Sequence, residues 1–569
     1  MAGKSGISQA RTRLGEALRQ LYERVWDALC AGAPIWQEPR MTQRTAIAQI
    51  AKTIGRELQD SARPSESAWA AGAMLADAGA TKEIVACLFI EAHRKRPSDR
   101  LINGCAFMLE RALDTLRLRA NGGDVGAGRA IEEVRQEIEQ ALVKDGATIE
   151  VLIMIARAFA QAELDPGEAL QEAVVSAMDA QSAALPPGQE PADIGDQFDD
   201  LAASLGNDPF TIYAEFAAMG AAFPAEHRAA MASALAMSNR AAVREAVLGF
   251  ACEANPTTSA AALMALAQPP RGCPVSSIMV DRLVRMRPWL AEPRRANLDA
   301  AIRGLRPKAT TPEPVPRPEI RSVMASLCDG AGAQSLFALV KRGRRFALAA
   351  VLVKMENGVA DAWVTDDMSK AEAEALIGEI VAGSETTEIS IGLLERRLAD
   401  ALASNVARDV PPPFGLLQVA EAIGLGLLHP EAISPERLVQ ELLADLPAER
   451  TGTVAATAAH RASVKWEQEF RTLESWFEAG EAVETLLRPI RTRKQRIEAV
   501  LTRLLPGRRN FWAERCAWTA AVLKESAEDD ETWIDFALVA RDLADGCALE
   551  SMPLAAQIAA ATIEAFVHR

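Results

Sequence analysis

The sequence predicts a mainly α-helical, multi-domain protein with a solenoid-like repeat segment and a small α+β module that contains a three-stranded antiparallel meander. Alanine, the strongest helix former, is the commonest residue, and apolar side chains recur at helical spacing along most of the chain. Between residues 335 and 365 the pattern changes to three β-prone runs separated by short turns. We therefore expect helices before and after one small sheet.

Proline-rich stretches divide the chain, because proline stops a helix and cannot donate to a sheet. A length of 569 residues allows about three or four folded units. The predicted segments are an N-terminal helical domain (1–184), a linker (185–195), a helical array (196–306), a proline-rich linker (307–319), the α+β module (320–433) and a C-terminal helical domain (434–569).

The N-terminal domain shows helical periodicity throughout. A first helix is predicted from an apolar face formed by Leu14, Leu18, Leu21, Val25 and Leu29. No apolar signal-peptide core precedes it, so we expect a cytoplasmic protein. A second amphipathic helix spans 128–146, with Gly146 as its C-cap, and a third from Thr148 is apolar nearly all round, as in a buried helix.

The segment 209–306 contains short helices at even spacing. Their starts are expected near Pro224, Asn239, Pro256, Pro274 and Pro293. The sequences PAEHRAAMASALAMSN, RAAVREAVLGFACEANP and TTSAAALMALAQ form helix pairs of about 35 residues. At the level of architecture they resemble HEAT- and armadillo-like α-solenoids. The resemblance implies stacked helix pairs and an extended concave surface for a protein partner.

The α+β module is predicted from three apolar runs, SLFALVK, RRFALAAVLVK and VADAWVT. Asn357-Gly358 between the second and third is a strong hairpin signal, because both residues tolerate positive φ. The preceding RSVMASL has a helical pattern, so residues 329–332 are expected to join a helix to the sheet. Ser369 and Glu372 form a capping box that begins the following helix.

The C-terminal domain is predicted to be helical from Ser434-Pro435 onward, an N-cap followed by proline at the first helical position. Large aromatic side chains in an Ala- and Leu-rich chain usually fill spaces between helices. We therefore expect a core built on Trp466, Trp476, Trp512, Trp518 and Trp533.

Charge and cysteine usage narrow the functional classes. A net charge of −15 disfavours binding of nucleic acid or anionic membranes over the whole surface, and no apolar run is long enough to span a membrane. The eight cysteines are far apart and lack a CxxC pair, as expected for reduced, buried thiols in the cytoplasm. The excess of arginine over lysine is typical of a GC-rich bacterial genome.

Catalytic and metal-binding motifs are absent from the sequence. The five histidines (His93, His227, His429, His460 and His568) are isolated, and HExxH, GxSxG, P-loop and GxGxxG patterns do not occur. We therefore predict no catalytic residues, metal or cofactor. One enzymatic alternative is a magnesium-dependent nuclease, because Asp329, Asp361, Asp366 and Asp367 around the meander are loosely similar to the carboxylates of RNase-H-like enzymes.

Two basic clusters support a second alternative, nucleic-acid binding. The first lies at 341–345 and the second at 488–509. The candidate phosphate contacts are Arg342, Arg344, Arg345, Arg491, Arg493, Lys494 and Arg496. We favour a third prediction over both alternatives: the protein is a non-catalytic helical scaffold or adaptor that binds a protein partner.

Overall fold

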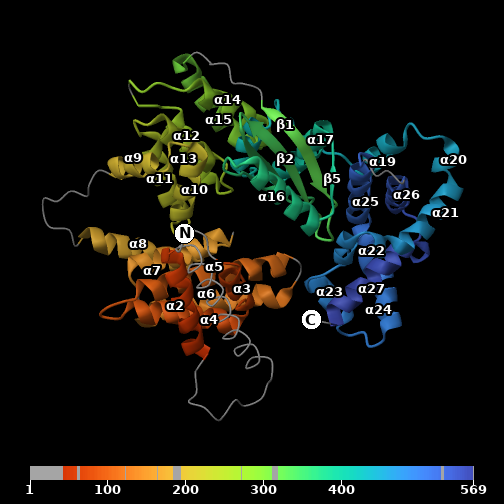
Figure 1. Cartoon of the computed structure of the whole chain (residues 1–569), viewed down its shortest axis with the longest axis horizontal. Helices are drawn as coiled ribbons and strands as arrows, with labels where there is room; N and C mark the ends of the chain where they lie inside the picture. Colours follow the sequence, from red (N-terminus) through yellow and green to blue (C-terminus); the bar gives the residue numbers. More distant parts are fainter. Residues whose placement is uncertain are drawn as a thin grey trace, which may run out of the picture. The chain divides into compact units, whose positions relative to one another are not determined.

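The computed structural model describes residues 43–60, 65–121, 124–145, 147–162, 164–183, 194–270, 272–310, 318–526 and 531–567. The fold is mainly helical with one small antiparallel sheet (Figure 1). The described residues of Met1–Ala192 and Glu215–Arg228 form one compact unit, and those of Asp193–Ala214 and Ala229–Arg569 form a second.

The N-terminal part of the chain is helical, as predicted. Its elements are α2 (Gln43–Asp60), α3 (Glu66–Met74), α4 (Ala78–Ala92), α5 (Asp99–Asn121), α6 (Val125–Asp145), α7 (Ile149–Gln161) and α8 (Glu168–Ala183). The apolar stripe of α6 is buried at Ile131, Val134 and Ile138. Helix α7 buries one face, and Glu150, Arg157 and Gln161 are exposed on the opposite face, so it is not buried all round as expected. The predicted helix at Leu14–Leu29, the C-cap at Gly146 and most of the linker 185–195 lie outside the described residues.

The array between 194 and 308 consists of short helices. They are α9 (Ile194–Ser204), α10 (Pro209–Gly220), α11 (Ala225–Ala236), α12 (Ala241–Ala251), α13 (Pro256–Leu266), α14 (Ser277–Met286), η1 (Arg287–Trp289), α15 (Glu292–Leu305) and η2 (Arg306–Lys308). The helix starts lie within three residues of the predicted ones. At α13, the Asn255 side chain accepts hydrogen bonds from the amides of Thr257 and Thr258. Membership of the α-solenoid class stays a prediction.

The sheet has five antiparallel strands in the order β4-β3-β2-β1-β5. They are β1 (Glu319–Ser326), β2 (Ala333–Arg342), β3 (Arg345–Lys354), β4 (Gly358–Val364) and β5 (Thr386–Glu388). The predicted meander is confirmed as β2, β3 and β4. In the second turn Gly358 adopts positive φ, whereas Asn357 does not.

The prediction of a helix at RSVMASL is wrong, because residues 321–326 of this segment belong to β1. The local sequence pattern does not determine the secondary structure of this segment. Residues Glu319 to Ala325 pair with β2, and this pairing outweighs a weak local preference for helix. Residues 329–332 therefore join two strands, and β5 adds a further strand.

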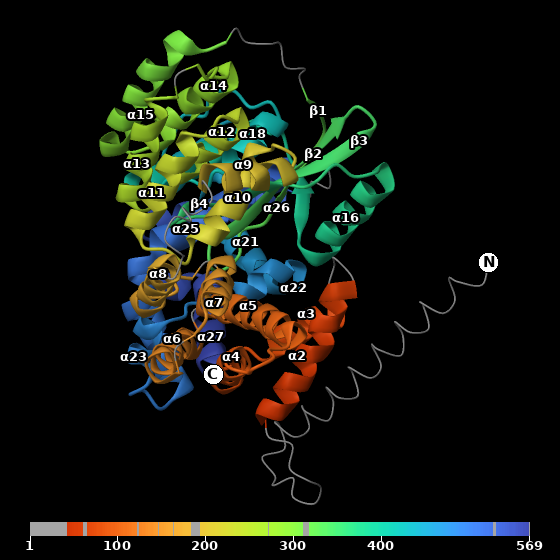
Figure 2. The ribbon, with the colours of Figure 1, turned by 90° about the vertical axis from the view of Figure 1, so that its left-hand side faces the viewer.

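The two faces of the sheet are covered unequally. Along β2, Gln334, Leu336, Ala338 and Val340 are buried, while the alternate residues are half-buried. Helices α17 (Ile391–Ala407) and α18 (Gly415–Ala422) pack on the buried, inner face, where Arg397 donates to Gln334 at 2.8 Å. Figures 1 and 2 show α16 (Lys370–Gly383) alongside the strands, and it packs on the outer face through β3.

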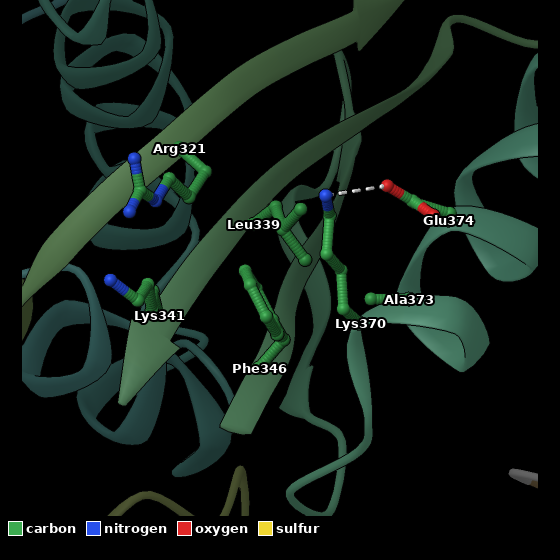
Figure 3. Close-up of a pocket in the computed structure, with 7 residues that line it drawn as sticks. All are labelled: Arg321, Leu339, Lys341, Phe346, Lys370, Ala373 and Glu374. Atoms are coloured by element: carbon green, nitrogen blue, oxygen red, sulfur yellow. Dashed lines mark ion pairs between the residues drawn. The ribbon is translucent and has the colours of Figure 1, made fainter. Parts of the chain in front are cut away.

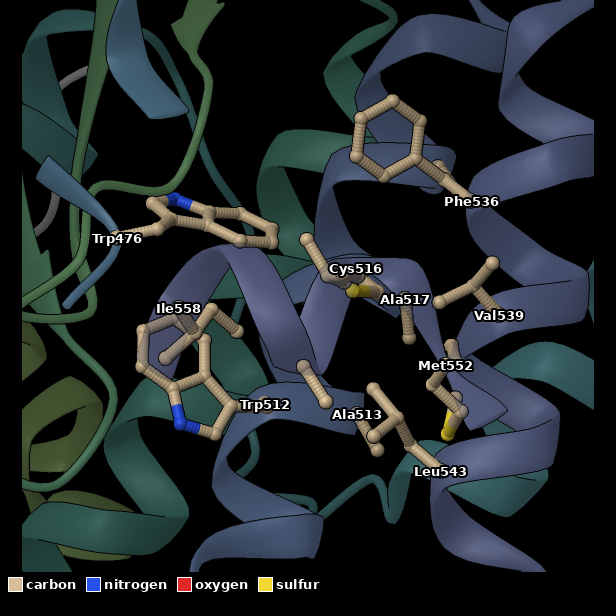
Figure 4. Packing of buried hydrophobic residues seen from close by; sticks show 14 of the residues in the cluster. Trp476, Trp512, Ala513, Cys516, Ala517, Phe536, Val539, Leu543, Met552 and Ile558 are labelled. Carbon is tan, nitrogen blue, oxygen red and sulfur yellow. The ribbon is translucent and has the colours of Figure 1, made fainter. Parts of the chain in front are cut away.

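The C-terminal helices enclose an apolar core of the second unit. They are α19 (Pro435–Leu443), α20 (Ala448–Thr451), α21 (Thr453–Ala462), η3 (Ser463–Lys465), α22 (Trp466–Glu469), η4 (Arg471–Ser475), α23 (Glu481–Leu487), α24 (Arg493–Ala499), η5 (Val500–Leu504), η6 (Leu505–Arg508), α25 (Arg509–Lys524), α26 (Thr532–Ala544), η7 (Leu549–Ser551) and α27 (Pro553–Val567). Trp476, Trp512 and Phe536 face this core (Figure 4), and Trp466 stacks on Phe536 with ring centroids 3.7 Å apart. The predicted role of the five tryptophans is confirmed, because all are buried.

A buried arginine joins the sheet to these helices. Arg515 of α25 is fully buried and donates to the carbonyl oxygens of Asp329 and Gly330, at 3.1 and 3.0 Å. From the other side, Trp476 Nε1 donates to the Cys328 carbonyl at 3.0 Å. Burial lowers the pKa of Arg515 to about 10, so the guanidinium stays charged at neutral pH.

A second buried arginine joins the array to the module. Arg282 of α14 donates to both carboxylate oxygens of Glu421 in α18, at 2.7 and 2.8 Å, and to Glu245 of α12 at 2.8 Å. Nearby, Arg294 pairs with Asp409 at 2.9 Å and Trp289 Nε1 donates to the Leu428 carbonyl at 3.1 Å. These contacts fix α14 and α15 against the module that follows the proline-rich linker, whose residues 311–317 lie outside the described part.

Replacing Gly330 by alanine tests the first joint. A Cβ at Gly330 would lie 1.6 Å from the Ser475 carbonyl oxygen, so backbone must move. We expect Gly330→Ala to lower the free energy of unfolding by about 1–3 kcal/mol in denaturant titrations. The control is Gly378→Ala in α16, where a Cβ meets nothing within 4 Å and is expected to stabilise by about 0.5–1 kcal/mol. Equal changes in the free energy of unfolding for the two variants would contradict the close packing of the turn against Ser475.

Removing the Arg282 guanidinium tests the second joint. Arg282→Met leaves Glu245 and Glu421 without their shared cation, and breaking a buried ion pair from one side costs about 3–5 kcal/mol of unfolding free energy. Arg287→Met is the matched control, because its pair with Asp299 lies at the surface and is expected to contribute little. A loss for Arg282→Met no larger than that of the control would show that the joint is not held by this arginine.

Candidate functional site

Helix α16 is the least buried cover of the sheet. Its start is fixed by the predicted capping box: the Ser369 amide donates to Glu372 at 2.7 Å, and the Glu372 amide donates to Ser369 Oγ at 3.3 Å. Of its residues, Ala373 alone is buried, and Val381 is 51% exposed. The helix therefore lies over the outer face of the sheet without sealing it.

A hollow of about 440 Å³ opens between the sheet and the first turns of α16. Leu339 and Phe346 from β2 and β3 form an apolar floor together with Ala373 of α16 (Figure 3). Charged side chains surround this floor: Arg321 and Lys341 on the strands, and Lys370 and Glu374 on the helix. We call this feature the sheet–α16 hollow.

The cations of the sheet–α16 hollow converge on carboxylates. Glu319, the first residue of β1, pairs with Arg321 at 2.6 Å and with Lys341 at 3.0 Å. Lys370 pairs with Glu374 at 3.4 Å (Figure 3). The hydrogen bond from Lys341 lowers the pKa of Glu319, so this carboxylate is ionised between the two cations at neutral pH.

A second hollow of about 430 Å³ lies at the other end of α16. Val381 and Ser384 line it from the end of α16, Thr386 and Thr387 from β5, and Phe470 and Trp533 from the C-terminal helices. Glu385 beside it accepts hydrogen bonds from the amides of Arg471 and Thr472, at 2.7 and 2.8 Å. Both ends of α16 thus border open, partly apolar space.

The first predicted basic cluster borders the sheet–α16 hollow. Arg342 pairs with Asp367 at 3.3 Å, and Arg345 donates to the Asp367 carbonyl. Arg344 is exposed at the tip of the β2–β3 hairpin and makes no hydrogen bond or ion pair to a described residue. Lys341 belongs to both the cluster and the hollow.

The second predicted basic cluster is partly neutralised. Arg493 pairs with Glu564 at 2.9 Å, and Arg496 donates to the Ile490 carbonyl and lies over the Phe566 ring. Arg491 and Lys494 are exposed and have no such partner within the described part of the chain. No hydrogen bond or ion pair among the described residues joins this cluster to the first one.

The central carboxylates do not converge. Asp329 lies near Lys354 at one end of β3, while Asp366 lies near Phe346 at the other, because Met368 bridges to Phe346. Eight residues of strand separate these ends by about 26 Å. Asp329 accepts from the Ala333 amide at 2.7 Å, and burial raises its pKa. Across the ranges that the structure describes, no group of three or more His, Cys, Asp or Glu is arranged to hold a metal ion.

Sequence reasoning missed Arg321 and Glu319, and it did not single out Lys370. The predicted bounds put Glu319 in the linker and Arg321 in a helix, so they do not bring either residue beside Lys341 on an adjacent strand. The available signal for a strand is that the charged residues Glu319 and Arg321 alternate with Ile320 and Ser322. This alternation is short, and a bulge at Arg321 interrupts the pairing of the strand.

The fold and this site define a mainly helical protein with a partly open α+β module, and none of the helices that the structure describes has the length and apolar character needed to cross a membrane. Residues 436–567 match the family described as the Y4lR C-terminal helical domain, and residues 224–309 match the Y4lR second domain. These matches cover the C-terminal helices and part of the array.

One similar protein is "Uncharacterized protein y4lR" of the bacterium Sinorhizobium fredii (strain NBRC 101917 / NGR234). It is 30% identical over 255 residues, which cover 44% of this chain and 47% of that protein. The match thus spans about half the length of the curated relative. No solved structure matches the chain.

Hydrogen exchange tests how lightly α16 is held. Helices with few buried side chains open locally at low cost in free energy. We expect amides of residues 374–383 to exchange at least tenfold faster than those of 395–407 in α17, which buries seven side chains including Leu398 and Leu402. Mass spectrometry of exchanged, digested protein measures both. Equal protection of the two helices would show that α16 seals the sheet.

Proposed function

We propose that this protein is a non-catalytic scaffold or adaptor that binds a protein partner through the outer face of its sheet. The observation that carries the proposal is the partial cover of that face: α16 buries one residue completely and leaves a hollow at each end. An apolar surface that the fold leaves half open is a common feature of protein interaction sites.

The rest of the second unit supports a scaffold. Arg282 and Arg515 are buried at two joints, so the array, the module and the C-terminal helices are held together by desolvated, charge-assisted hydrogen bonds. Such a body presents its exposed surfaces in a fixed arrangement. A fixed surface reduces the entropy that is lost when a partner binds.

We propose a cytoplasmic location for the protein. The cysteines of the described part are free, and Cys87, Cys105, Cys252, Cys328 and Cys516 are buried. Reduced thiols of this kind are typical of proteins in a reducing compartment.

Nucleic-acid binding is the second candidate, and the exposed cations Arg344, Arg491 and Lys494 favour it. It ranks below protein binding because Arg342 and Arg493, from the same clusters, already have carboxylate partners. A nucleic-acid ligand would be recognised by loss of binding with added salt.

Affinity purification from the native host tests the adaptor. We expect the tagged chain to recover one stoichiometric protein, and Val381→Asp to reduce its recovery at least tenfold, because a charge would enter the half-open face. Val381 is 51% exposed, so this change should leave the fold intact. Val454→Asp, at a residue 83% exposed on α21, is the matched control.

Two outcomes would contradict the adaptor. In the first, no protein is recovered, or the same amount is recovered with Val381→Asp. In the second, the recovered ligand is DNA or RNA and is lost when Arg491, Arg493 and Lys494 are changed to glutamate, which would establish nucleic-acid binding instead.

A further inference from the structure

We propose that the sheet–α16 hollow binds a short polypeptide segment of the partner that combines carboxylates with apolar side chains. This inference rests on the proposed adaptor function and specifies the chemistry of the segment that the site takes. It is carried by three features of the hollow: its two-cation clamp, its apolar floor and its size.

The clamp consists of Arg321 and Lys341, which extend from adjacent strands toward one carboxylate. In this structure that carboxylate belongs to Glu319, at 2.6 Å from the guanidinium and 3.0 Å from the ammonium group. The pair is therefore already arranged to hold a carboxylate. Glu319 is 52% exposed at the first position of β1, so a carboxylate from a partner can replace it without opening the core.

The floor requires apolar side chains in the same segment. Leu339 and Phe346 lie between the clamp on the strands and Lys370 on α16 (Figure 3). Covering these side chains removes apolar surface from water, which contributes about 25 cal/mol for each Å² buried. The volume of about 440 Å³ lies within the range of about 300–1,000 Å³ that is usual for ligand pockets, so a few residues fill it.

The charge of the lining selects an acidic partner. Three cations, Arg321, Lys341 and Lys370, line the hollow with Glu374, and Glu319 lies beside the clamp, so cations exceed carboxylates by one in a chain of net charge −15. This local excess of positive charge complements a segment that carries aspartate or glutamate. The apolar floor and the carboxylates of Glu319 and Glu374 disfavour a continuous row of phosphates, so a polypeptide fits better than a nucleic acid.

The test uses the full chain and three short fluorescein-labelled peptides measured by fluorescence anisotropy. One peptide alternates glutamate with leucine and phenylalanine, one replaces glutamate by lysine, and one replaces the apolar residues by serine. We expect the first to bind most tightly and to weaken with added salt. The double variant Arg321→Glu and Lys341→Glu is expected to weaken its binding at least tenfold.

Two further variants separate the clamp from general effects of charge. Glu319→Gln removes the internal carboxylate, so we expect severalfold tighter binding of the acidic, apolar peptide. Arg344→Glu, at an exposed hairpin position outside the hollow, should leave binding unchanged. Because these side chains are at least partly exposed, circular dichroism should be the same for all variants.

Three results would overturn the proposal: equal binding of the acidic and basic peptides, equal binding after charge reversal at Arg321 and Lys341, or weaker binding after Glu319→Gln. Affinity purification with the double variant distinguishes this failure from failure of the adaptor. A partner that is recovered from the host equally well by the double variant would leave the adaptor standing and remove the hollow as its docking site.

Discussion

The contact of the Arg515 guanidinium with the turn at Asp329-Gly330 is the constraint on which the second unit depends. A fully buried charged group is stable only where its hydrogen-bond donors have acceptors. The Arg515 guanidinium donates to the backbone carbonyls of Asp329, Gly330 and Phe511. The turn enters the helical domain so closely that residue 330 has no room for a side chain. The position of the sheet, and with it the orientation of its outer face, follows from this insertion.

Buried arginines connect the parts of this unit beside apolar contacts, such as those of Cys328 and Met355 with the C-terminal core and of Phe210 with Phe414. Arg282 and Arg294 approach α18 and the loop at Asp409 in the same manner as Arg515 approaches its turn: a planar, permanently charged group with several donors fits between two elements. Directional bonds define a single geometry, whereas Ala-rich apolar surfaces allow helices to slide. The inner face of the sheet is fixed in this way, while α16 on the outer face has a capping box and few buried side chains.

The helices, the meander and the capping box were predictable because each has a local cause: periodicity, turn residues or a cap. Segment β1 was not, since Val323 to Ala325 suits a helix or a strand equally well and its partner, β2, decides. The candidate site shares this limitation. Lys341 was identified as part of a cluster, but its relation to Arg321, Glu319 and Lys370 depends on register and on the position of α16. Likewise Asp329 and Asp366 both flank strands of the same sheet in the sequence, yet they lie at opposite ends of β3.

The turn at residues 329–332 also restricts how this chain can change over evolutionary time. Loops between neighbouring strands usually tolerate insertions, because they extend into solvent. Here the carbonyls of the turn accept hydrogen bonds from Arg515 of the C-terminal helices, so an added residue would displace them from the Arg515 guanidinium. Length variation among homologues should therefore be found at the solvent-facing Gly343-Arg344 turn, which is also the better place to introduce an epitope or a reporter.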